Sequence, residues 1–223
     1  MIGRSTREDE PMAIEEPERK TEMLLIESIE PLPVQSCEAA IVQRLLADMR
    51  SVDAGLLEHG KRTAQYSVAL GHALHLARTD LAQLYLAGLL HDIGKLTLPR
   101  DLRRREAAFS PNDYAVMQCH PRSGAEMLAG IPFLHAAAVW IAHHHERWDG
   151  TGYPYGLRDL LIPLGSRILA VADLFDELAF SKQHPKDSRV AMSLLARAAG
   201  SQLDPLLVER FLAILNHRHG SAG

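Results

Sequence analysis

Apolar residues recur at helical spacing along most of the chain, with polar residues between them. Within 38–49, 54–76 and 164–181 the apolar positions fall every three or four residues, which predicts amphipathic helices with one buried face. Two more helices are expected over 187–199 and 205–216. The sequence contains no alternating strand pattern and no hairpin turn signal. We therefore predict an all-α bundle of about eight or nine helices.

Individual residues mark the ends and the inward faces of these helices. Ile41 belongs to the apolar stripe of the first helix, and Ala73 belongs to that of the second. Asp80 is the expected N-cap of the helix that continues to residue 90. Ser110 followed by Pro111 predicts another helix start, because serine caps helices and proline fits the first helical position.

Composition divides the chain into a body and two short ends. Residues 1–35 are polar and punctuated by proline, and the first thirty hold nine acidic against four basic residues. Such a segment is typical of a disordered acidic tail. We expect an N-terminal helix and linker over 36–53, a functional body over 54–216 and a short tail over 217–223.

Composition also excludes several classes of protein. No uncharged apolar stretch approaches the roughly 20 residues that span a bilayer, and the N-terminus lacks the apolar segment of a secretory signal. The net charge of -4 resides in the acidic tail, so the body is nearly neutral, unlike a protein that binds duplex nucleic acid. Cys37 and Cys119 are far apart and fit a reducing compartment. We expect a cytoplasmic protein without a membrane segment.

The chain holds 12 histidines, and most of them fall between His59 and His145. One of them opens the segment His91-Asp92-Ile93-Gly94-Lys95, which closes an apolar helical run. Ionisable side chains at a core boundary are costly unless a metal or tight hydrogen bonds compensate them. Two interpretations are open for this segment alone: a metal site at which Gly94 allows a turn, or an ordinary helix C-terminus capped by glycine.

Further candidate ligands downstream favour the metal site. They are imidazoles and carboxylates at helix ends or on apolar helices, and the full set is His59, His91, Asp92, His120, His144, His145 and Asp173. These groups suit iron, manganese, zinc or nickel, and the lack of thiolates argues against a structural zinc site. Seven ligands exceed the need of one ion, so we expect two divalent transition metals bridged by Asp92 and a hydroxide.

The remaining histidines and a basic segment have simpler interpretations. Surface or hydrogen-bonded positions are expected for His72, His75, His135, His184, His217 and His219. The role of His143 stays open, because neighbouring residues of a helix point about 100° apart and three successive histidines cannot all face one site. The basic residues Arg100 and 103–105 are expected in a solvated loop rather than in phosphate steering.

The order of these motifs resembles the HD-GYP family of metal-dependent phosphodiesterases, within the HD-domain superfamily. The resemblance rests on HDIGK followed by HHERWDGTGYP, with supporting segments at His120-Pro121 and at Leu203-Asp204-Pro205. It covers about residues 56–214. An HD pair alone is a weak signal, whereas HD, HHE and GYP in this order are specific.

The resemblance implies a bacterial second-messenger enzyme that hydrolyses cyclic di-GMP to pGpG and/or GMP through a metal-bridging hydroxide. By this resemblance the seven candidate residues are the metal ligands, with iron or manganese favoured over zinc and nickel. Asp92 bridges the metals, and Lys95 neutralises the attacked phosphate. Gly152, Tyr153 and Pro154 shape the substrate side, where Tyr153 is available to stack on the nucleotide.

Two departures from the family pattern refine this expectation. Gly55 stands where members with three metals have glutamate, which favours two metals here. Lys182 stands in a segment where the family tends to place an arginine, and lysine lacks the bidentate fork of arginine. The nucleotide is therefore open, with another cyclic dinucleotide such as cyclic GMP-AMP as an alternative substrate. A different class, a catalytically weak metal-binding module that docks partners through the GYP loop, is disfavoured by the complete ligand set. Homodimerisation or docking of a signalling protein stays open.

Overall fold

The structure is a computed structural model that describes residues 36–103, 110–180 and 188–220, without the side chains of Ser36 and 217–220. These ranges contain helices, turns and loops but no strand, and an isolated bridge joins Ala199 and Leu203. The all-α prediction is therefore confirmed. The predicted acidic tail, 1–35, lies outside the described residues.

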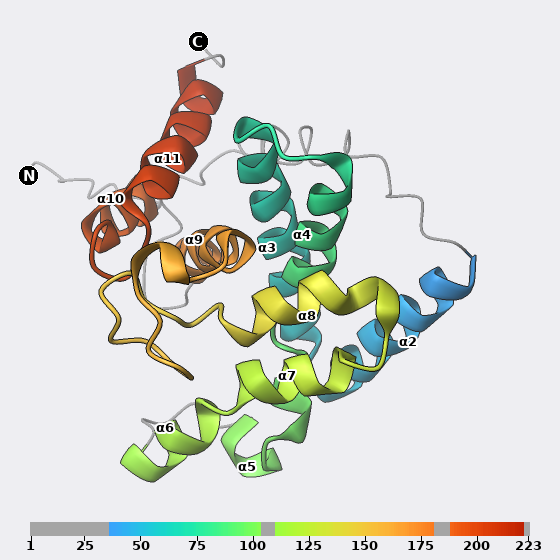
Figure 1. The fold of residues 1–223 in the computed structure, drawn as a ribbon. Helices are drawn as coiled ribbons and strands as arrows, with labels where there is room; N and C mark the ends of the chain where they lie inside the picture. Colours follow the sequence, from blue (N-terminus) through green and yellow to red (C-terminus); the bar gives the residue numbers. More distant parts are fainter. Residues whose placement is uncertain (1–35, 104–109, 181–187, 221–223) are drawn as a thin grey trace, which may run out of the picture. The chain divides into compact units, whose positions relative to one another are not determined.

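Helices follow one another along the described chain in the order shown in Figure 1. They are α2 (Ser36–Val52), α3 (Ala54–Ala73), α4 (Arg78–Leu90), the 3-10 helix η1 (Ile93–Thr97), α5 (Arg100–Arg103), α6 (Pro111–Met117), α7 (His120–Leu128), η2 (Pro132–Leu134), α8 (His135–Ala142), η3 (Asp159–Leu161), α9 (Leu164–Phe180), α10 (Ser188–Ala198) and α11 (Pro205–Gly220). The last helix continues four residues beyond its expected end at 216. Among the helices described, none combines the length and the apolar character that crossing a bilayer requires.

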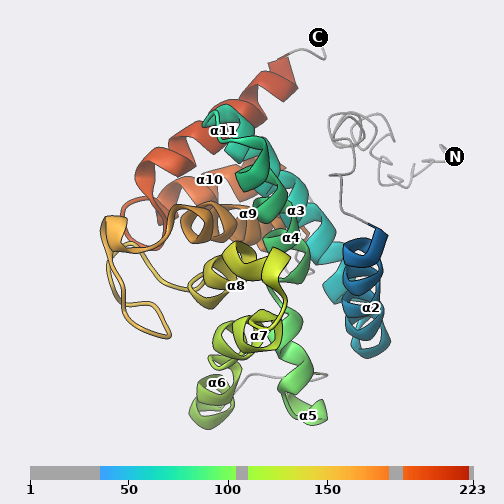
Figure 2. The same ribbon diagram turned by 45° about the vertical axis from the view of Figure 1, so that its right-hand side comes forward.

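The centre of the fold is formed by α3 and α4 together with α8 and α9 (Figure 1 and Figure 2). Leu90 at the end of α4, Ile141 in α8 and Leu169 in α9 are fully buried in one apolar core. On another side of α3, Tyr66 packs edge-on against Phe175 of α9 and Phe211 of α11. The buried apolar residues thus fix the positions of the helix ends that carry the candidate ligands.

Two glycines permit close backbone approaches near these helix ends. A Cβ atom on Gly88 of α4 would overlap the backbone of Ala64 in α3, so this glycine lets the two helices pack tightly. A Cβ atom on Gly94 would overlap the carbonyl oxygen of His120 in α7. The expected reason for Gly94 was a turn, but its backbone is not in the left-handed region. The requirement is the close approach of η1 to α7.

The inward faces differ from the sequence prediction at two positions. Ile41 is exposed, whereas Val42 and Met49 of the same helix are buried. Leu45 and Leu46 pack against the same core, so Val42 rather than Ile41 continues their stripe. Short-range spacing does not determine which of two adjacent apolar residues faces the core. Ala73 is also exposed, since α3 ends there.

Helix starts agree with the sequence prediction in one case and not in the other. Ser110 forms a capping box with Asp113, and Pro111 occupies the first turn as predicted. Asp80 does not cap α4: the N-cap is Ala77, and Asp80 lies in the first turn. A carboxylate in the first turn still interacts favourably with the helix dipole.

Candidate metal centre

The sequence-predicted ligands come from separate helices and meet at one place. His59 belongs to α3, His91 and Asp92 follow α4, His120 begins α7, His144 and His145 follow α8, and Asp173 lies within α9. Five of them are buried, and His59 and His145 are partly buried. The fold therefore brings together residues that are more than 100 positions apart in the sequence.

The first cluster consists of His59, His91 and Asp173. The Nε2 atoms of His59 and His91 are 3.1 Å apart. The Oδ1 atom of Asp173 lies 3.0 Å from Nε2 of His59 and 3.4 Å from Nε2 of His91. Three potential donor atoms thus face a common point, as a bound cation requires.

The second cluster consists of His120, His144 and His145, whose donor atoms lie within 4.8 Å of one another. The rings of His144 and His145 have centroids 4.0 Å apart. The ring of His144 also contacts His91 of the first cluster, with centroids 5.3 Å apart. The two clusters are therefore adjacent.

Asp92 lies between the clusters. Its Oδ2 atom is 3.6 Å from Nε2 of His91 and 3.9 Å from Nε2 of His59. Its Oδ1 atom is 3.4 Å from Nε2 of His120 in the second cluster. The amino group of Lys95 donates to Oδ2 at 2.6 Å. One carboxylate thus presents an oxygen to each cluster, which is the geometry of a bridging ligand.

Backbone carbonyls orient three of the imidazoles. The Nδ1 atoms of His91, His120 and His144 lie 2.8, 2.8 and 2.7 Å from the carbonyl oxygens of Gly88, Met117 and Ile141. Each ring therefore donates its Nδ1–H to the preceding turn and directs an Nε2 lone pair into the site. These bonds follow from the position of each histidine at a helix end.

The ring of His59 is oriented by a side-chain carboxylate, that of Asp176, which sequence analysis did not identify. Asp176 is buried at 1% exposure, and its Oδ2 atom lies 2.7 Å from Nδ1 of His59. Arg62, one turn after His59, donates two hydrogen bonds to the same carboxylate at 2.6 and 2.8 Å. The guanidinium of Arg62 lies over the ring of Phe180, 4.0 Å from its centroid. The sequence did contain a signal for this role, because Asp176 lies three residues after Asp173 and therefore on the same face of the predicted helix.

The donor set fits a divalent metal. With the Nδ1–H groups of His59 and His91 committed to other acceptors, their Nε2 atoms, which face each other and a carboxylate oxygen, are the ring nitrogens left to bind a cation. Among the described residues, Nε2 of His120, Nε2 of His144 and Oδ1 of Asp173 are buried without a hydrogen-bond partner. Buried acceptors without donors are costly, and a cation or added protons would satisfy them.

Charge in the first cluster favours a proton on His59 when no metal is bound. Burial alone lowers the pKa of His59, but the neighbouring carboxylates of Asp173 and Asp176 outweigh burial and raise this pKa to about 10. Burial tends to raise the pKa of Asp92, yet Lys95 and the histidines outweigh burial and hold it well below its usual range. The carboxylate that lies between the clusters is therefore ionised.

In the second cluster the pKa values of two histidines are lowered rather than raised. Burial lowers the pKa of His145 to about 4, and burial lowers that of His144 well below its ordinary value. Both imidazoles are therefore neutral at physiological pH, as metal ligation requires.

The predicted substrate loop folds back onto the histidine run. The backbone N–H of Tyr153 donates to the carbonyl oxygen of His145 at 3.2 Å, and the two rings are in contact. Gly152 is needed there, because a Cβ atom would overlap the backbone of Arg147. Pro154 follows a cis peptide bond and is partly buried. Lys182, the other predicted substrate contact, lies outside the described residues.

Comparison with known proteins identifies the family. The profile of the HD domain matches residues 41–207, three quarters of the chain. This chain belongs to the HD-domain family. Its membership agrees with the resemblance to HD-GYP proteins drawn from the motifs.

Curated relatives of this HD domain are phosphodiesterases. A cyclic di-GMP phosphodiesterase of Vibrio cholerae is 35% identical over 186 residues, which cover 76% of this chain and 37% of the relative. The cyclic di-GMP phosphodiesterase response regulator RpfG of Xanthomonas campestris is 31% identical, over 80% of this chain and 48% of the relative. A 3'3'-cGAMP-specific phosphodiesterase of Vibrio cholerae is 33% identical, over 69% of this chain and 30% of the relative. The chain spans less than half the length of these relatives.

Solved structures confirm the fold of the HD domain. An HDG"Y"P protein from Bdellovibrio bacteriovorus superposes with a TM-score of 0.62 at 22% identity, covering 89% of this chain and 69% of that protein. A cyclic GMP-AMP specific phosphodiesterase of Vibrio cholerae also gives a TM-score of 0.62, at 24% identity, covering 78% of this chain and 48% of that protein. At these low identities the superpositions establish the helical architecture alone.

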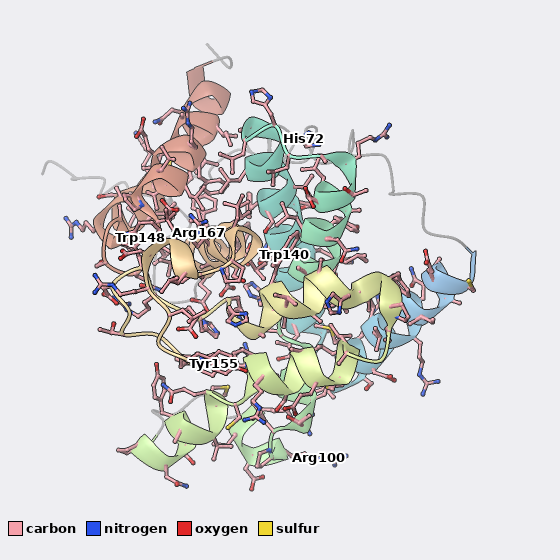
Figure 3. The ribbon with its side chains drawn as sticks, in the orientation of Figure 1. His72, Arg100, Trp140, Trp148, Tyr155 and Arg167 are labelled. Atoms are coloured by element: carbon pink, nitrogen blue, oxygen red, sulfur yellow. The ribbon has the colours of Figure 1, made fainter. Side chains whose placement is uncertain are left out.

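Several other sequence-predicted residues of the HD domain lie away from the two clusters. His72, His75 and His135 are exposed as expected, and Figure 3 shows His72 at the far end of α3. His143 donates from Nδ1 to the carbonyl oxygen of Val139 at 2.7 Å and belongs to neither cluster. Arg100 also lies at the surface, as expected, but it begins the short helix α5 rather than lying in a loop (Figure 3).

The start of α3 offers no further ligand. Gly55 donates its backbone N–H to the N-cap Asp53, and Glu58 pairs with Lys61 on the exposed face of the helix. Neither residue directs a side-chain donor at His59. The expectation of two metals rather than three stays a prediction.

Proposed function

We propose that this HD domain is a metal-dependent phosphodiesterase that hydrolyses cyclic di-GMP to pGpG and/or GMP. The observation that supports this function most directly is the convergence of imidazole lone pairs and carboxylate oxygens in two adjacent clusters joined by Asp92. The names of the curated relatives supply the substrate class, because they act on cyclic di-GMP or on 3'3'-cGAMP.

Each cluster would hold one ion. His59, His91 and Asp173 form one set of ligands, and His120, His144 and His145 form the other. Asp92 would be shared, with one oxygen directed at each. Iron or manganese suits this mixture of nitrogen and oxygen donors, and zinc and nickel also accept it. When bound, such ions supply Lewis acidity and a hydroxide nucleophile at neutral pH.

Lys95 would act on the phosphate and on Asp92 together. Burial lowers its pKa, but the Asp92 carboxylate outweighs burial and raises the pKa, so the amino group is charged. Its side chain is partly exposed, whereas Asp92 is 2% exposed. The partly exposed Lys95 side chain thus places its ammonium against the buried carboxylate, where it can offset negative charge that develops on phosphoryl oxygens during attack.

Gly152, Tyr153 and Pro154 would line the substrate side of the second cluster. Tyr153 contacts the ring of His145, with centroids 5.0 Å apart. Burial raises the pKa of Tyr153, which keeps its hydroxyl protonated and able to donate a hydrogen bond. We also assign Lys182 to this side, as the charged residue of the segment in which the family tends to place an arginine.

Product analysis with purified full-length protein tests this function. The protein is loaded with iron, manganese, zinc or nickel in separate samples and incubated with cyclic di-GMP or 3'3'-cGAMP. We expect pGpG or GMP from cyclic di-GMP in at least one metal, and no product from Asp92→Ala. Faster cleavage of 3'3'-cGAMP would assign the alternative substrate. Tight binding of a dinucleotide without product in any metal would favour the interaction module over the enzyme.

A further inference from the structure

Two tyrosines of the substrate loop pair with two histidines of the run after α8. Tyr153 contacts His145, with ring centroids 5.0 Å apart and planes inclined by 36°. Tyr155 contacts His143, with centroids 5.3 Å apart and planes inclined by 38°. The loop thus runs antiparallel to the histidine run, and every second residue of one pairs with every second residue of the other.

The two pairs differ in their relation to the metal clusters. The inner pair includes His145, a member of the second cluster, and its tyrosine is partly buried. The outer pair lies outside both clusters, because His143 is a member of neither set of potential donors. Tyr155 is 58% exposed. The outer ring is therefore accessible to a ligand without being required for metal binding.

A buried carboxylate holds Tyr155 in place despite its exposure. Glu146 is 3% exposed, and its Oε1 atom accepts the backbone N–H of Tyr155 at 2.7 Å. Its Oε2 atom accepts the backbone N–H of Leu157 at 3.0 Å. Hydrogen bonds to a buried carboxylate are strong, so the backbone that carries the exposed ring is fixed before any ligand arrives.

A fixed aromatic ring with one face on an imidazole and the rest exposed is a surface for a planar aromatic ligand. Figure 3 shows Tyr155 at the turn of the loop, on the side toward α6 and α7. Purine bases stack on such rings, and stacking is a large part of base binding to protein surfaces. The substrate class assigned above carries two purines, each attached to a ribose, and the riboses are joined by the phosphates that the metal clusters would bind.

We propose that Tyr155, supported by His143 and held by Glu146, stacks on a purine base of the substrate at the outer edge of the site. This inference rests on the proposed function and refines it: Tyr153 borders the metal centre, whereas Tyr155 binds the nucleobase. Stacking uses the π face that all purines share, so Tyr155 contributes affinity for guanine and adenine alike and does not select between them.

Steady-state kinetics of metal-loaded Tyr155→Ala and Tyr155→Phe variants tests the inference. With cyclic di-GMP and with 3'3'-cGAMP we expect Tyr155→Ala to raise KM by about tenfold, with a much smaller change in kcat and no loss of metal. Tyr155→Phe keeps the ring and should restore a KM within about twofold of the parent. Leu160→Ala is the matched control, because it removes an exposed apolar side chain from η3, which follows the loop.

Other outcomes would overturn the inference. An unchanged KM in Tyr155→Ala would exclude stacking. A fall in kcat together with metal loss would assign Tyr155 a structural role in the loop. GMP binding to the same metal-loaded proteins separates this inference from the proposed function. If the parent cleaves no cyclic dinucleotide but binds GMP, stacking is supported when Tyr155→Ala binds GMP more weakly and Tyr155→Phe and Leu160→Ala do not. If the parent binds no nucleotide, both the function and the stacking surface are wrong.

Discussion

The carboxylate of Asp176 holds the His59 ring from the side opposite His91. Its Oδ2 atom lies 2.7 Å from Nδ1 of His59, while Nε2 of the same ring lies 3.1 Å from Nε2 of His91. Arg62 neutralises the buried carboxylate through two hydrogen bonds. A carboxylate behind a ligating histidine fixes its tautomer and raises its basicity. Arg62 and Asp176 therefore form one unit with His59 and orient this proposed ligand of the first cluster.

Replacement of Asp176 by asparagine should weaken this unit without removing a ligand. Asp176→Asn keeps the shape but loses the charge that pairs with Arg62 and supports His59. We expect metal affinity to fall by about 10- to 100-fold, measured by competition with a chromophoric chelator. Glu58→Gln is the control, since Glu58 neighbours His59 in sequence but pairs with Lys61 at the surface. Equal affinities of Asp176→Asn and the parent would contradict the orienting role.

Asp92→Ala should remove the oxygen donors shared by the two clusters. We expect metal content to fall and cleavage of cyclic di-GMP to drop by at least about a hundredfold, because both sites lose a ligand at once. Metal content by plasma emission spectroscopy and product formation are measured on the same sample. A variant that keeps full metal content and activity would show that Asp92 does not bridge.

Lys95→Gln separates transition-state stabilisation from metal binding. Glutamine can still donate a hydrogen bond to Asp92, but it lacks the charge that offsets developing negative charge on phosphate. We expect kcat to fall by about 10²- to 10³-fold, while metal content stays near that of the parent. Loss of the metal in Lys95→Gln, at unchanged activity per bound metal, would instead assign Lys95 to ordering Asp92.

The sequence predicted the helices and the ligand types because both follow from local features. Helical spacing identified α3 and α9, and His91 and Asp92 lie at the predicted end of a helix. The role of Asp176 was not predicted, since its partners lie 114 and 117 positions away in the sequence. The role of His143 could not be decided either, because it depends on how the chain turns after α8. Local pattern thus gave the candidate residues, and long-range packing determined which of them face the clusters.

Metal binding should release a proton at alkaline pH. The pKa of His59 is raised to about 10 in the metal-free site, so at pH 8 this ring holds a proton that a metal must displace. Titration calorimetry at pH 8 in buffers of different ionisation enthalpy counts the released protons. We expect the parent to release more protons per bound metal than His59→Asn. Identical proton release by the two proteins would show that His59 is neutral before metal binds.

Acid should destabilise the metal-free protein through the second cluster. His145 has its pKa lowered to about 4 by burial, whereas an unfolded histidine titrates near 6.5, so the unfolded chain binds the proton more readily. Above pH 6.5 His145 is neutral in both the folded and the unfolded chain, so it costs the folded state nothing. As pH falls from 6.5 through 4, protonation of the unfolded chain lowers the free energy of unfolding. The upper bound is about 3 kcal/mol. Thermal unfolding in the presence of a chelator measures this loss.

His145→Asn isolates the contribution of this ring, because asparagine does not titrate in that range. We expect Tm of the metal-free variant to change less than that of the parent between pH 6.5 and 4, while His135→Asn, at an exposed position, should follow the parent. Parallel stability curves for His145→Asn and the parent would contradict the burial of a neutral imidazole in the second cluster. The first cluster responds to pH in the opposite direction, because the pKa of His59 is raised and the stability that its proton contributes is lost as pH rises through 10. Metal-free protein should thus be most stable near pH 6.5.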